Sequence, residues 1–431
     1  MSWKTHYAEH TMPVEEAIKR IHSGDRVVTG HACGEPTYIL DAMVAHADDY
    51  ENVEIVHMVP MGKSPYCAPG MEKHFRHNGL FLGGSTRAAV AEGRADYTPT
   101  FFFEAPRLFS TTLPVDVAVV QVSLPDEEGN FSLGISIDYT YEAVMQAKTV
   151  IAQVNEQMPY IYGKTTIPAE KIDCFVLHDA PLIELAPPKI GPVEEAIGAN
   201  VASLVHDGDT LQLGIGAIPD AVLKFLTDKK DLGIHSEMFS DGVVDLAEAG
   251  VITNAKKSLH PGKYVVTFLM GTRRLYDFVD KNPDVYMAPV DYVNNPFVVA
   301  QNDNLVYINA CVQIDLMGQV ASESIGYKQI SGTGGQVDFI RGASMSKGGR
   351  SILAFPSTTK GTISKIVPLL DEGAAVTTSR NDVDYVVTEY GIAHLKGHTL
   401  RQRARALIAI AHPDFRPQLQ EEYERRFHEK F

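Results

Sequence analysis

The sequence has few cysteines, a single tryptophan and no long apolar run. Its four cysteines among 431 residues show no C-x-x-C spacing, so a disulfide framework, a zinc knuckle and a dithiol redox pair are not expected. No segment approaches the ~18 consecutive apolar residues that span a bilayer, and the charged N-terminus has no apolar core of signal-peptide length. We therefore expect a cytoplasmic protein without a membrane partner.

Clusters of positive charge are also missing. The chain carries 38 Lys and Arg against 54 Asp and Glu, a formal net charge of −16, and its basic residues form only short fragments such as Lys229-Lys230 and Arg425-Arg426. Such a balance repels nucleic acid and anionic lipid. We expect neither as a partner.

The remaining composition is that of a globular protein. Apolar residues make up 45% and charged residues 21% of the chain, with 34 glycines and 24 prolines, which excludes a disordered or fibrous chain. At roughly 100–200 residues per domain, the length predicts two or three domains.

An internal repeat indicates how these domains are organised. Pro13–Ile18 recurs letter for letter as Pro192–Ile197, and each copy is followed by Gly-Asp, an apolar run, a glycine and a proline in the same order. An ordered string of matches at similar spacing favours two related halves. The consecutive prolines within 186–189 make the best boundary, because they cannot continue a helix or a central strand. We predict domains 1–187 and 188–431.

The alternation of apolar runs with helical patterns predicts an α/β fold with buried sheets. Runs typical of strands are 27–29, 115–122, 149–154, 211–213, 306–308 and 351–355. The segment 401–431 is predicted to form helices broken around Pro413 and Pro417.

Two glycine-rich loops are candidates for ligand binding. Gly214–Pro219 lies between an apolar strand and a helical start, and Ser331–Gln336 precedes another helical pattern. Such loops let backbone N–H groups approach a ligand oxygen. From spacing alone, however, the first loop fits a tight turn required only for packing better than a ligand site, and the second is equally compatible with a flexible surface loop. The first is not a Rossmann fingerprint, because Pro219 replaces its third glycine.

Other candidate residues are less specific. Glu237, in a short run with apolar neighbours, fits either an exposed strand position or a desolvated nucleophile. His394 and His398 have the spacing of metal ligands on a helix, but Gly391 and Gly397 argue against a regular helix there. No metal site is therefore predicted, and the P-loop and the G-x-S-x-G nucleophile elbow are both absent.

Five longer strings stand out in the sequence, namely GIGAIPDAV, HSEMFSDGVVDL, GTGGQVDFIRGA, AFPSTTKGTISKIVP and VTTSRNDVDYVVTEYGIAHLKG. Together they resemble the family of acetyl-CoA hydrolases and CoA-transferases, and within it most closely the 4-hydroxybutyrate and butyrate:acetate CoA-transferases. The resemblance covers the whole chain. It implies two tandem α/β domains of the CoA-transferase type with the active site between them.

The resemblance also implies roles for individual residues. Glu237, within SEMFSDG, matches the family's catalytic glutamate, and Asn294 matches an asparagine facing the glutamyl carbonyl, although Asn295 adjoins it. Glu389 resembles a residue lining the coenzyme A (CoA) site, and we expect CoA phosphates to need local donors such as Lys360 or Lys365. The groups implied for the oxyanion and for CoA are Gly214, Ile215, Gly216, Gly334, Gly335, Glu389 and Lys360.

The activity implied is a CoA transfer by covalent ping-pong catalysis. A glutamate carboxylate attacks the acyl thioester, and the released CoA thiolate then converts the mixed anhydride into a glutamyl-CoA thioester. CoA would be substrate and covalent intermediate, with no other tightly bound cofactor. The expected partners are short-chain acyl-CoA and carboxylic acids, in a homodimer or higher homo-oligomer.

The repeat adds one expectation about the first half. Alignment of Gly62 with Gly242 places His57 opposite Glu237, so this half lacks the nucleophile and its loop Val59–Gly62 is predicted to line the acyl group through Met61 and Gly62. The acids themselves stay open. Alternatives are a short-chain acyl-CoA hydrolase, a CoA-transferase for a dicarboxylate such as itaconate, and a CoA-binding protein without catalysis.

Overall fold

The computed structural model describes residues 2–431, which form two compact units. The first unit comprises residues up to Ala186 together with Tyr264–Val293, and the second comprises Pro187–Lys263 and Asn294–Phe431. The division after Ala186 falls in the predicted Pro-rich boundary. The sequence-based domains differ from these units in residues 264–293, which were expected in the second half.

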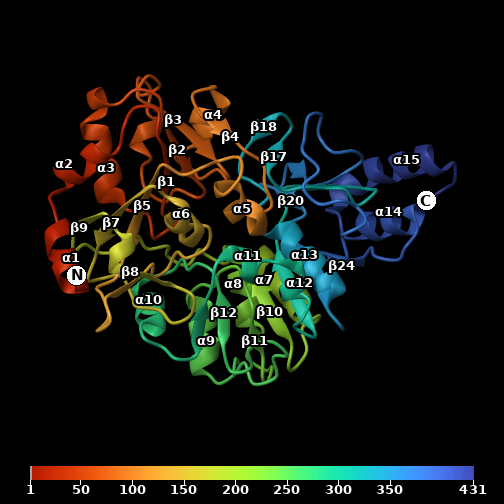
Figure 1. Cartoon of the computed structure of the whole chain (residues 1–431). Helices are drawn as coiled ribbons and strands as arrows, with labels where there is room; N and C mark the ends of the chain where they lie inside the picture. The colour runs from red at the N-terminus through yellow and green to blue at the C-terminus, as the bar shows by residue number, and fades with distance from the viewer. Residues whose placement is uncertain (1) are drawn as a thin grey trace. The chain divides into compact units, whose positions relative to one another are not determined.

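The first unit is built on a seven-stranded parallel sheet of order β4-β3-β2-β1-β5-β7-β9 (Figure 1, red to yellow). Its central strand β5 is buried at every position, as expected for a parallel strand covered on both faces. The strands are β1 Arg26–Thr29, β2 Val53–His57, β3 Phe75–Gly79, β4 Asp96–Tyr97, β5 Val117–Val122, β7 Thr149–Val154 and β9 Cys174–Leu177.

Short helices surround this sheet. Helix α6 packs on β1 and β5, and α2 packs on α3 and β9. The helices of residues 2–186 are α1 Trp3–His10, α2 Val14–Ala17, α3 Thr37–Ala45, α4 Arg87–Ala91, α5 Ala105–Phe109 and α6 Thr140–Gln146, and the 3₁₀ turns are η1 Ile18–Arg20, η2 Ala47–Asp49, η3 Pro65–Cys67, η4 Phe102–Glu104 and η5 Ala169–Lys171.

The segment 264–293 joins the first unit through backbone hydrogen bonds. The carbonyl of Thr267 accepts from the N–H groups of Ile137 and Asp138, and that of Met287 accepts from Lys164. The segment contains β12 Tyr264–Val266, α10 Arg273–Val279, β13 Val285–Met287 and α11 Val290–Val293.

The second unit is built on a six-stranded sheet of order β11-β10-β14-β19-β23-β24. All its neighbours are parallel except the edge strand β24, which runs antiparallel to β23. The strands are β10 Thr210–Leu213, β11 Gly233–Ile234, β14 Leu305–Asn309, β19 Arg350–Ala354, β23 Tyr385–Thr388 and β24 Gly391–His394.

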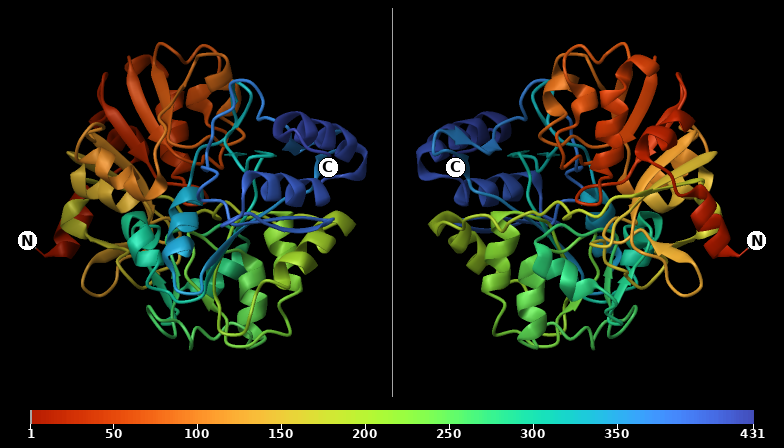
Figure 2. Two further views of the ribbon diagram at one scale, coloured as in Figure 1. Left: turned by 90° about the vertical axis from the view of Figure 1, so that its right-hand side faces the viewer. Right: turned by 90° about the vertical axis from the view of Figure 1, so that its left-hand side faces the viewer.

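Helix α7 packs on β19, β23 and β24, whereas α13 packs on β14 and β19. The C-terminal helices α14 and α15 lie side by side (Figure 2). The helical elements are α7 Pro192–Ala202, α8 Ala217–Lys224, α9 Asp241–Glu248, α12 Pro296–Val299, α13 Gln336–Met345, α14 Leu400–Ala409, η6 Pro413–Phe415 and α15 Arg416–Phe427. The α/β class is thereby confirmed.

Short strands complete both units. They are β6 Asn130–Ser132, β8 Thr166–Pro168, β15 Gln313–Asp315, β16 Val320–Ala321, β17 Ser324–Ile325, β18 Lys328–Gln329, β20 Thr358–Thr359, β21 Ile363–Ser364 and β22 Ile366–Val367.

The two units repeat the same local structure at the positions where the sequence repeats. The side chains of Asp25 and Asp209 each accept the N–H of the residue three before, His22 at 2.7 Å and His206 at 2.6 Å. Five residues after each aspartate, Gly30 donates its N–H to the carbonyl of Val119, and Gly214 donates in the same way to the carbonyl of Ile308. The predicted internal duplication is therefore present in the backbone hydrogen bonds.

Strand register corrects the detailed alignment of the halves. Arg26 pairs with Glu54 in the first sheet, and the equivalent Thr210 pairs with Gly233 in the second. Glu54 and Gly233 are therefore equivalent, and the residues four positions after them are Met58 and Glu237. Met58, and not His57, is thus the equivalent of Glu237. The alignment of Gly62 with Gly242 misses this because Met58 lies four residues before its glycine, whereas Glu237 lies five before its own.

All four cysteines are free and buried. Among the described residues, no helix combines the length and the apolar character needed to cross a membrane.

Candidate active site

The candidate site of the second unit lies where the strand order of its sheet reverses. The chain proceeds from β10 to β11 on one side, but β14, β19 and β23 follow on the other side of β10. Loops at the carboxyl ends of parallel strands meet at such a point and commonly bind ligands. The Gly214–Gly216 loop follows β10 here, and Asn309 ends β14.

The first glycine loop is shaped by its two outer glycines. A Cβ atom on Gly214 would fall 2.8 Å from Asn309 Oδ1, so a side chain would collide with the neighbouring strand end. Gly216 precedes α8 with a φ of 114°, which disfavours any other residue, while the Ile215 side chain is exposed. The loop thus brings backbone directly to the edge of the sheet, and the role of its N–H groups as oxyanion donors stays a prediction.

Glu237 lies three residues beyond β11 on a segment fixed by its neighbours. The N–H of His235 donates to Leu211, and Ser236 Oγ donates to the carbonyl of Met238. Upstream, Ile234 donates its N–H to Asn254 Oδ1, and its carbonyl accepts from the buried Lys257 Nζ. The half-buried Glu237 therefore projects from a segment whose residues on either side of it are fixed by hydrogen bonds.

The carboxylate of Glu237 contacts an amide from a distant part of the sequence. Asn294 Nδ2 donates to Glu237 Oε2 at 2.7 Å, and Asn294 is fully buried. The side chain of the adjacent Asn295 instead caps α12 by accepting the N–H of Phe297. This capping resolves which of the two asparagines faces Glu237.

The second glycine loop touches the same carboxylate. A Cβ atom on Gly335 would lie 3.1 Å from Glu237 Cδ and well inside 3.0 Å of both Glu237 Oε2 and Asn294 Nδ2. Because its φ of −91° suits any residue, Gly335 is required for space and not for backbone conformation. Gly334 has a φ of 54° and supplies the turn before it.

Polar residues that the sequence analysis missed support this loop. Gln336 accepts from Ser322 Oγ and Thr378 Oγ1 and donates to the carbonyl of Ala310, and Glu323 accepts from Thr333 Oγ1. These bonds hold the residues on both sides of Gly334 and Gly335.

Tyr307, on β14, was also missed. It is fully buried, and burial together with the charge of nearby Glu237 keeps its pKa well above the ordinary value. The phenol therefore stays neutral. A polar side chain near the carboxyl end of an otherwise apolar strand is the sequence signal that could have identified it.

Glu389 follows β23 and forms a second polar cluster. Its carboxylate accepts from the N–H and the Oγ of Ser357, at 2.9 and 2.6 Å. Lys365 lies near enough for the charge of Glu389 to raise its pKa, although burial has the larger effect and the net pKa is lowered. Lys360, by contrast, is exposed in the turn between β20 and β21.

Met61 and Gly62 belong to the first unit, on the loop after β2. Both are half-buried, and their N–H groups donate to the carboxylate of Glu35. His57, at the end of β2, is fully buried and bonded to Tyr66 Oη. Their placement against an acyl group stays a prediction.

The histidine pair has no metal-binding geometry. His394 lies on β24 and pairs with Asp384, while His398 lies in the following turn, with the two rings roughly perpendicular. Within residues 2–431, no group of three or more His, Cys, Asp or Glu side chains could hold a metal ion.

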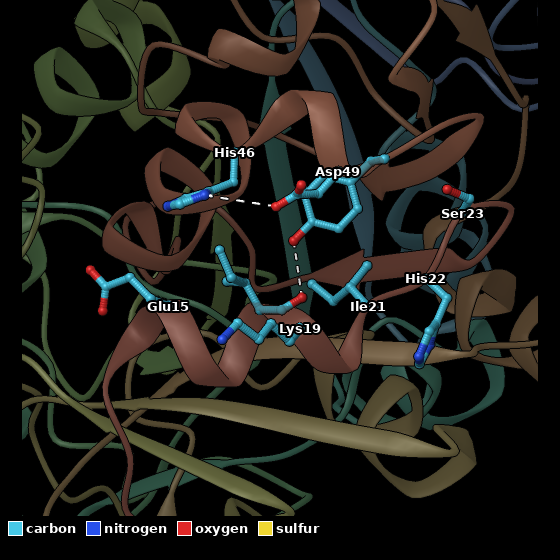
Figure 3. Close-up of a pocket in the computed structure, with 9 residues that line it drawn as sticks. Glu15, Lys19, Ile21, His22, Ser23, His46 and Asp49 are labelled. Atoms are coloured by element: carbon cyan, nitrogen blue, oxygen red, sulfur yellow. Dashed lines mark hydrogen bonds and ion pairs between the residues drawn. The ribbon is translucent and has the colours of Figure 1, made fainter.

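A hollow in the first unit is lined by none of the predicted site residues. It is bordered by Glu15, Lys19 and His22 near α2 and η1, and by His46 and Asp49 before β2 (Figure 3). His22 and Asp49 precede their strands, so this hollow lies at the amino ends of β1 and β2. Ligands of doubly wound sheets bind at the opposite ends, and we assign it no catalytic role.

Family models match both halves of the chain. Residues 1–187 match the acetyl-CoA hydrolase/transferase N-terminal domain, and residues 271–423 match the C-terminal domain of the same family.

Curated relatives match over nearly the whole length. A 4-hydroxybutyrate coenzyme A transferase of Clostridium kluyveri is 63% identical over 99% of this chain and 100% of its own. A butyryl-CoA:acetate CoA-transferase of Anaerostipes caccae is 38% identical over 97% of both chains. Among solved structures, the 4-hydroxybutyrate CoA-transferase of Porphyromonas gingivalis is 47% identical, with a TM-score of 0.86 over 99% of this chain and 100% of that one.

Proposed function

Because the chain belongs to the acetyl-CoA hydrolase/transferase family, we propose that it moves CoA from a short-chain acyl-CoA to a carboxylate such as acetate, with Glu237 as covalent carrier. The observation that carries this proposal is the contact of Glu237 Oε2 with Asn294 Nδ2 beneath Gly335. The donors considered are butyryl-, 4-hydroxybutyryl- and acetyl-CoA. The names of similar proteins contain 4-hydroxybutyrate in one case and butyryl-CoA with acetate in the other.

We propose different roles for the two carboxylate oxygens. Oε2 accepts the N–H of the Asn294 amide, and Oε1 is proposed to attack the acyl carbonyl. The attack forms a mixed anhydride and breaks the C–S bond, and the CoA thiolate then attacks the glutamyl carbonyl and releases the first acid as its carboxylate. An acceptor carboxylate reverses these two steps and regenerates Glu237.

Each step places negative charge on a carbonyl oxygen. When Glu237 is acylated, Oε2 becomes that oxygen, and the Asn294 N–H already points at it. Removal of a single donor of this kind commonly lowers kcat by a factor of about 10²–10³. The N–H groups of Ile215, Gly216, Gly334 and Gly335 are proposed as the further donors.

Coenzyme A must bind a chain with a strong negative charge. We propose that the cluster of Glu389, Ser357 and Lys365 contacts the CoA portion of the substrate, and that exposed Lys360 contributes a positive charge to its phosphates. Reversal of charge at Lys360 or at Lys365, in separate variants, should raise the KM for the CoA ester. If one variant has an unchanged KM, that lysine is not part of the CoA site.

For the acid portion we propose Met61 and Gly62. Met61→Gly is expected to change the ratio of kcat/KM between acetyl-CoA and butyryl-CoA, because removal of a side chain that borders an acyl group alters discrimination by about 1–3 kcal/mol. An unchanged ratio would remove the loop from the acyl pocket.

We further propose a cytoplasmic homo-oligomer. Four free, buried thiols fit a reducing compartment. Light scattering and sedimentation would establish the oligomeric state.

The activity itself is tested by incubation with butyryl-CoA in the presence and absence of acetate. A transferase forms acetyl-CoA with acetate and releases little free thiol without it. Rapid thiol release that is independent of acetate would instead identify a hydrolase, and replacement of acetate by itaconate tests the dicarboxylate alternative.

A further inference from the structure

Glu35 is a buried carboxylate of the first unit that no step above uses. It lies between the end of β1 and the start of α3, and its side chain is 2% exposed. A charged group is rarely buried in this way unless it is bonded.

Its partners are two consecutive backbone groups of the predicted acyl-binding loop. Glu35 Oε2 accepts the N–H of Met61 at 3.1 Å and that of Gly62 at 2.7 Å. A Cβ atom on Gly62 would fall 3.0–3.2 Å from the carboxylate atoms of Glu35, so the glycine permits the close approach.

The preceding part of this loop is anchored separately by neutral groups. Met58 donates its N–H to Tyr139 Oη, and the carbonyl of Val59 accepts from Ala32. Pro60 packs against Gly83, where an added Cβ would lie 2.7 Å from the Pro60 oxygen. Met61 and Gly62 are thus the part of the loop that a carboxylate holds.

The ionisable groups facing Glu35 come from each neighbouring segment. His31 and Cys33 lie on the same loop, Asp41 on α3, Tyr66 on η3 and Tyr139 before α6. From β5, the neutral Gln121 Nε2 donates to the Glu35 carbonyl. Burial raises the pKa of Glu35 to about 7, against the opposing effect of the two backbone donors.

We propose that Glu35 is a positioning residue for acyl selection, which fixes the backbone at Met61 and Gly62 and thereby the acyl-facing surface of the loop. The inference rests on the proposed function of that loop. Hydrogen bonds to a carboxylate are roughly twice as strong as those to a neutral acceptor. Ionised Glu35 therefore holds the loop more tightly than the protonated form.

The test is the ratio of kcat/KM for butyryl-CoA to that for acetyl-CoA, measured between pH 5.5 and 8.5. Ionisations that affect both thioesters equally cancel in this ratio. In the unaltered protein we expect it to change about fivefold, with a midpoint near pH 7. Glu35→Gln, which keeps the shape and an acceptor oxygen, should give a ratio that does not depend on pH.

Asp41→Asn is the matched control. Asp41 is exposed on α3 and raises the pKa of Glu35 through its charge. Its replacement should shift the midpoint to slightly lower pH and leave the amplitude unchanged.

Three outcomes overturn the inference. They are a ratio independent of pH in the unaltered protein, a Glu35→Gln profile that still titrates near pH 7, and Glu35→Gln changing kcat equally for both substrates without changing their ratio. If Met61→Gly also leaves the ratio unchanged, the loop does not contact the acyl group, and it is the proposed function of the loop that has failed. Melting curves for each variant establish that the compared proteins are folded.

Discussion

Substitution of Gly335 by alanine should inactivate the enzyme without unfolding it. The new Cβ atom would enter well inside 3.0 Å of Glu237 Oε2 and of Asn294 Nδ2, so the carboxylate must move by about 1 Å or the Asn294 bond must break. A misplacement of that size costs about 10² in rate. Loss of an oxyanion donor adds to it, so we expect kcat to fall about 10²–10⁴-fold, or roughly 3–5 kcal/mol in the activation barrier.

Gly342→Ala, on the helix α13 that directly follows Gly335, provides the matched control. Its Cβ atom would collide with Val299 in the core and contacts neither Glu237 nor Asn294, so it should lower the melting temperature and leave kcat of the folded protein nearly unchanged. The assay is acetyl-CoA formation from butyryl-CoA and acetate, together with thermal melting. A Gly335→Ala protein that retains kcat within threefold would refute the argument that this glycine is required for the position of the carboxylate.

Further substitutions test the remaining contacts. Asn294→Ala should lower kcat by about 10²–10³ with little change in KM, measured by steady-state kinetics; a rise in KM alone would contradict the assigned role. Ser357→Ala removes one bond to the Glu389 carboxylate and should lower kcat/KM for the CoA ester by about tenfold, mainly through KM, whereas a pure kcat effect would place Glu389 elsewhere. Because the pKa of Glu35 is raised from 4.5 to about 7, the native state holds this proton more tightly than the unfolded state. Its contribution to the free energy of unfolding should be fully present below about pH 4.5 and lost by about pH 7, a decrease of ~3 kcal/mol; denaturant titrations should show this slope, and Glu35→Gln should remove it.

Local patterns predicted the central strands well because these runs are buried on both faces. Residues 149–154 coincide with β7, and the run 115–122 contains β5, which begins two residues later. The membership of residues 264–293 in the first unit could not be predicted from such patterns. It depends on hydrogen bonds between Thr267 and residues more than a hundred positions away.

Within the site, the residue types were predictable but their mutual arrangement was not. The choice between Asn294 and Asn295 depends on the start of a four-residue helix, which the Asn295 side chain caps. The alignment of His57 with Glu237 was wrong. It matched the glycines of two loops that differ in length by one residue, and only the strand register reveals this difference. Tyr307 gave only the weak signal of a polar side chain near the end of an apolar strand, and Glu35 gave none, since a single buried polar side chain acquires meaning only from its neighbours in space.

Detection of the covalent intermediate tests the central claim most directly. The protein is incubated with butyryl-CoA without an acceptor acid, digested at mildly acidic pH and analysed by mass spectrometry. We expect the peptide containing residue 237 to gain the mass of CoA less one water, and the gain to disappear after addition of acetate and in Glu237→Gln. An active protein whose adduct lies on another residue, or whose Glu237→Gln variant still exchanges CoA, would contradict the account.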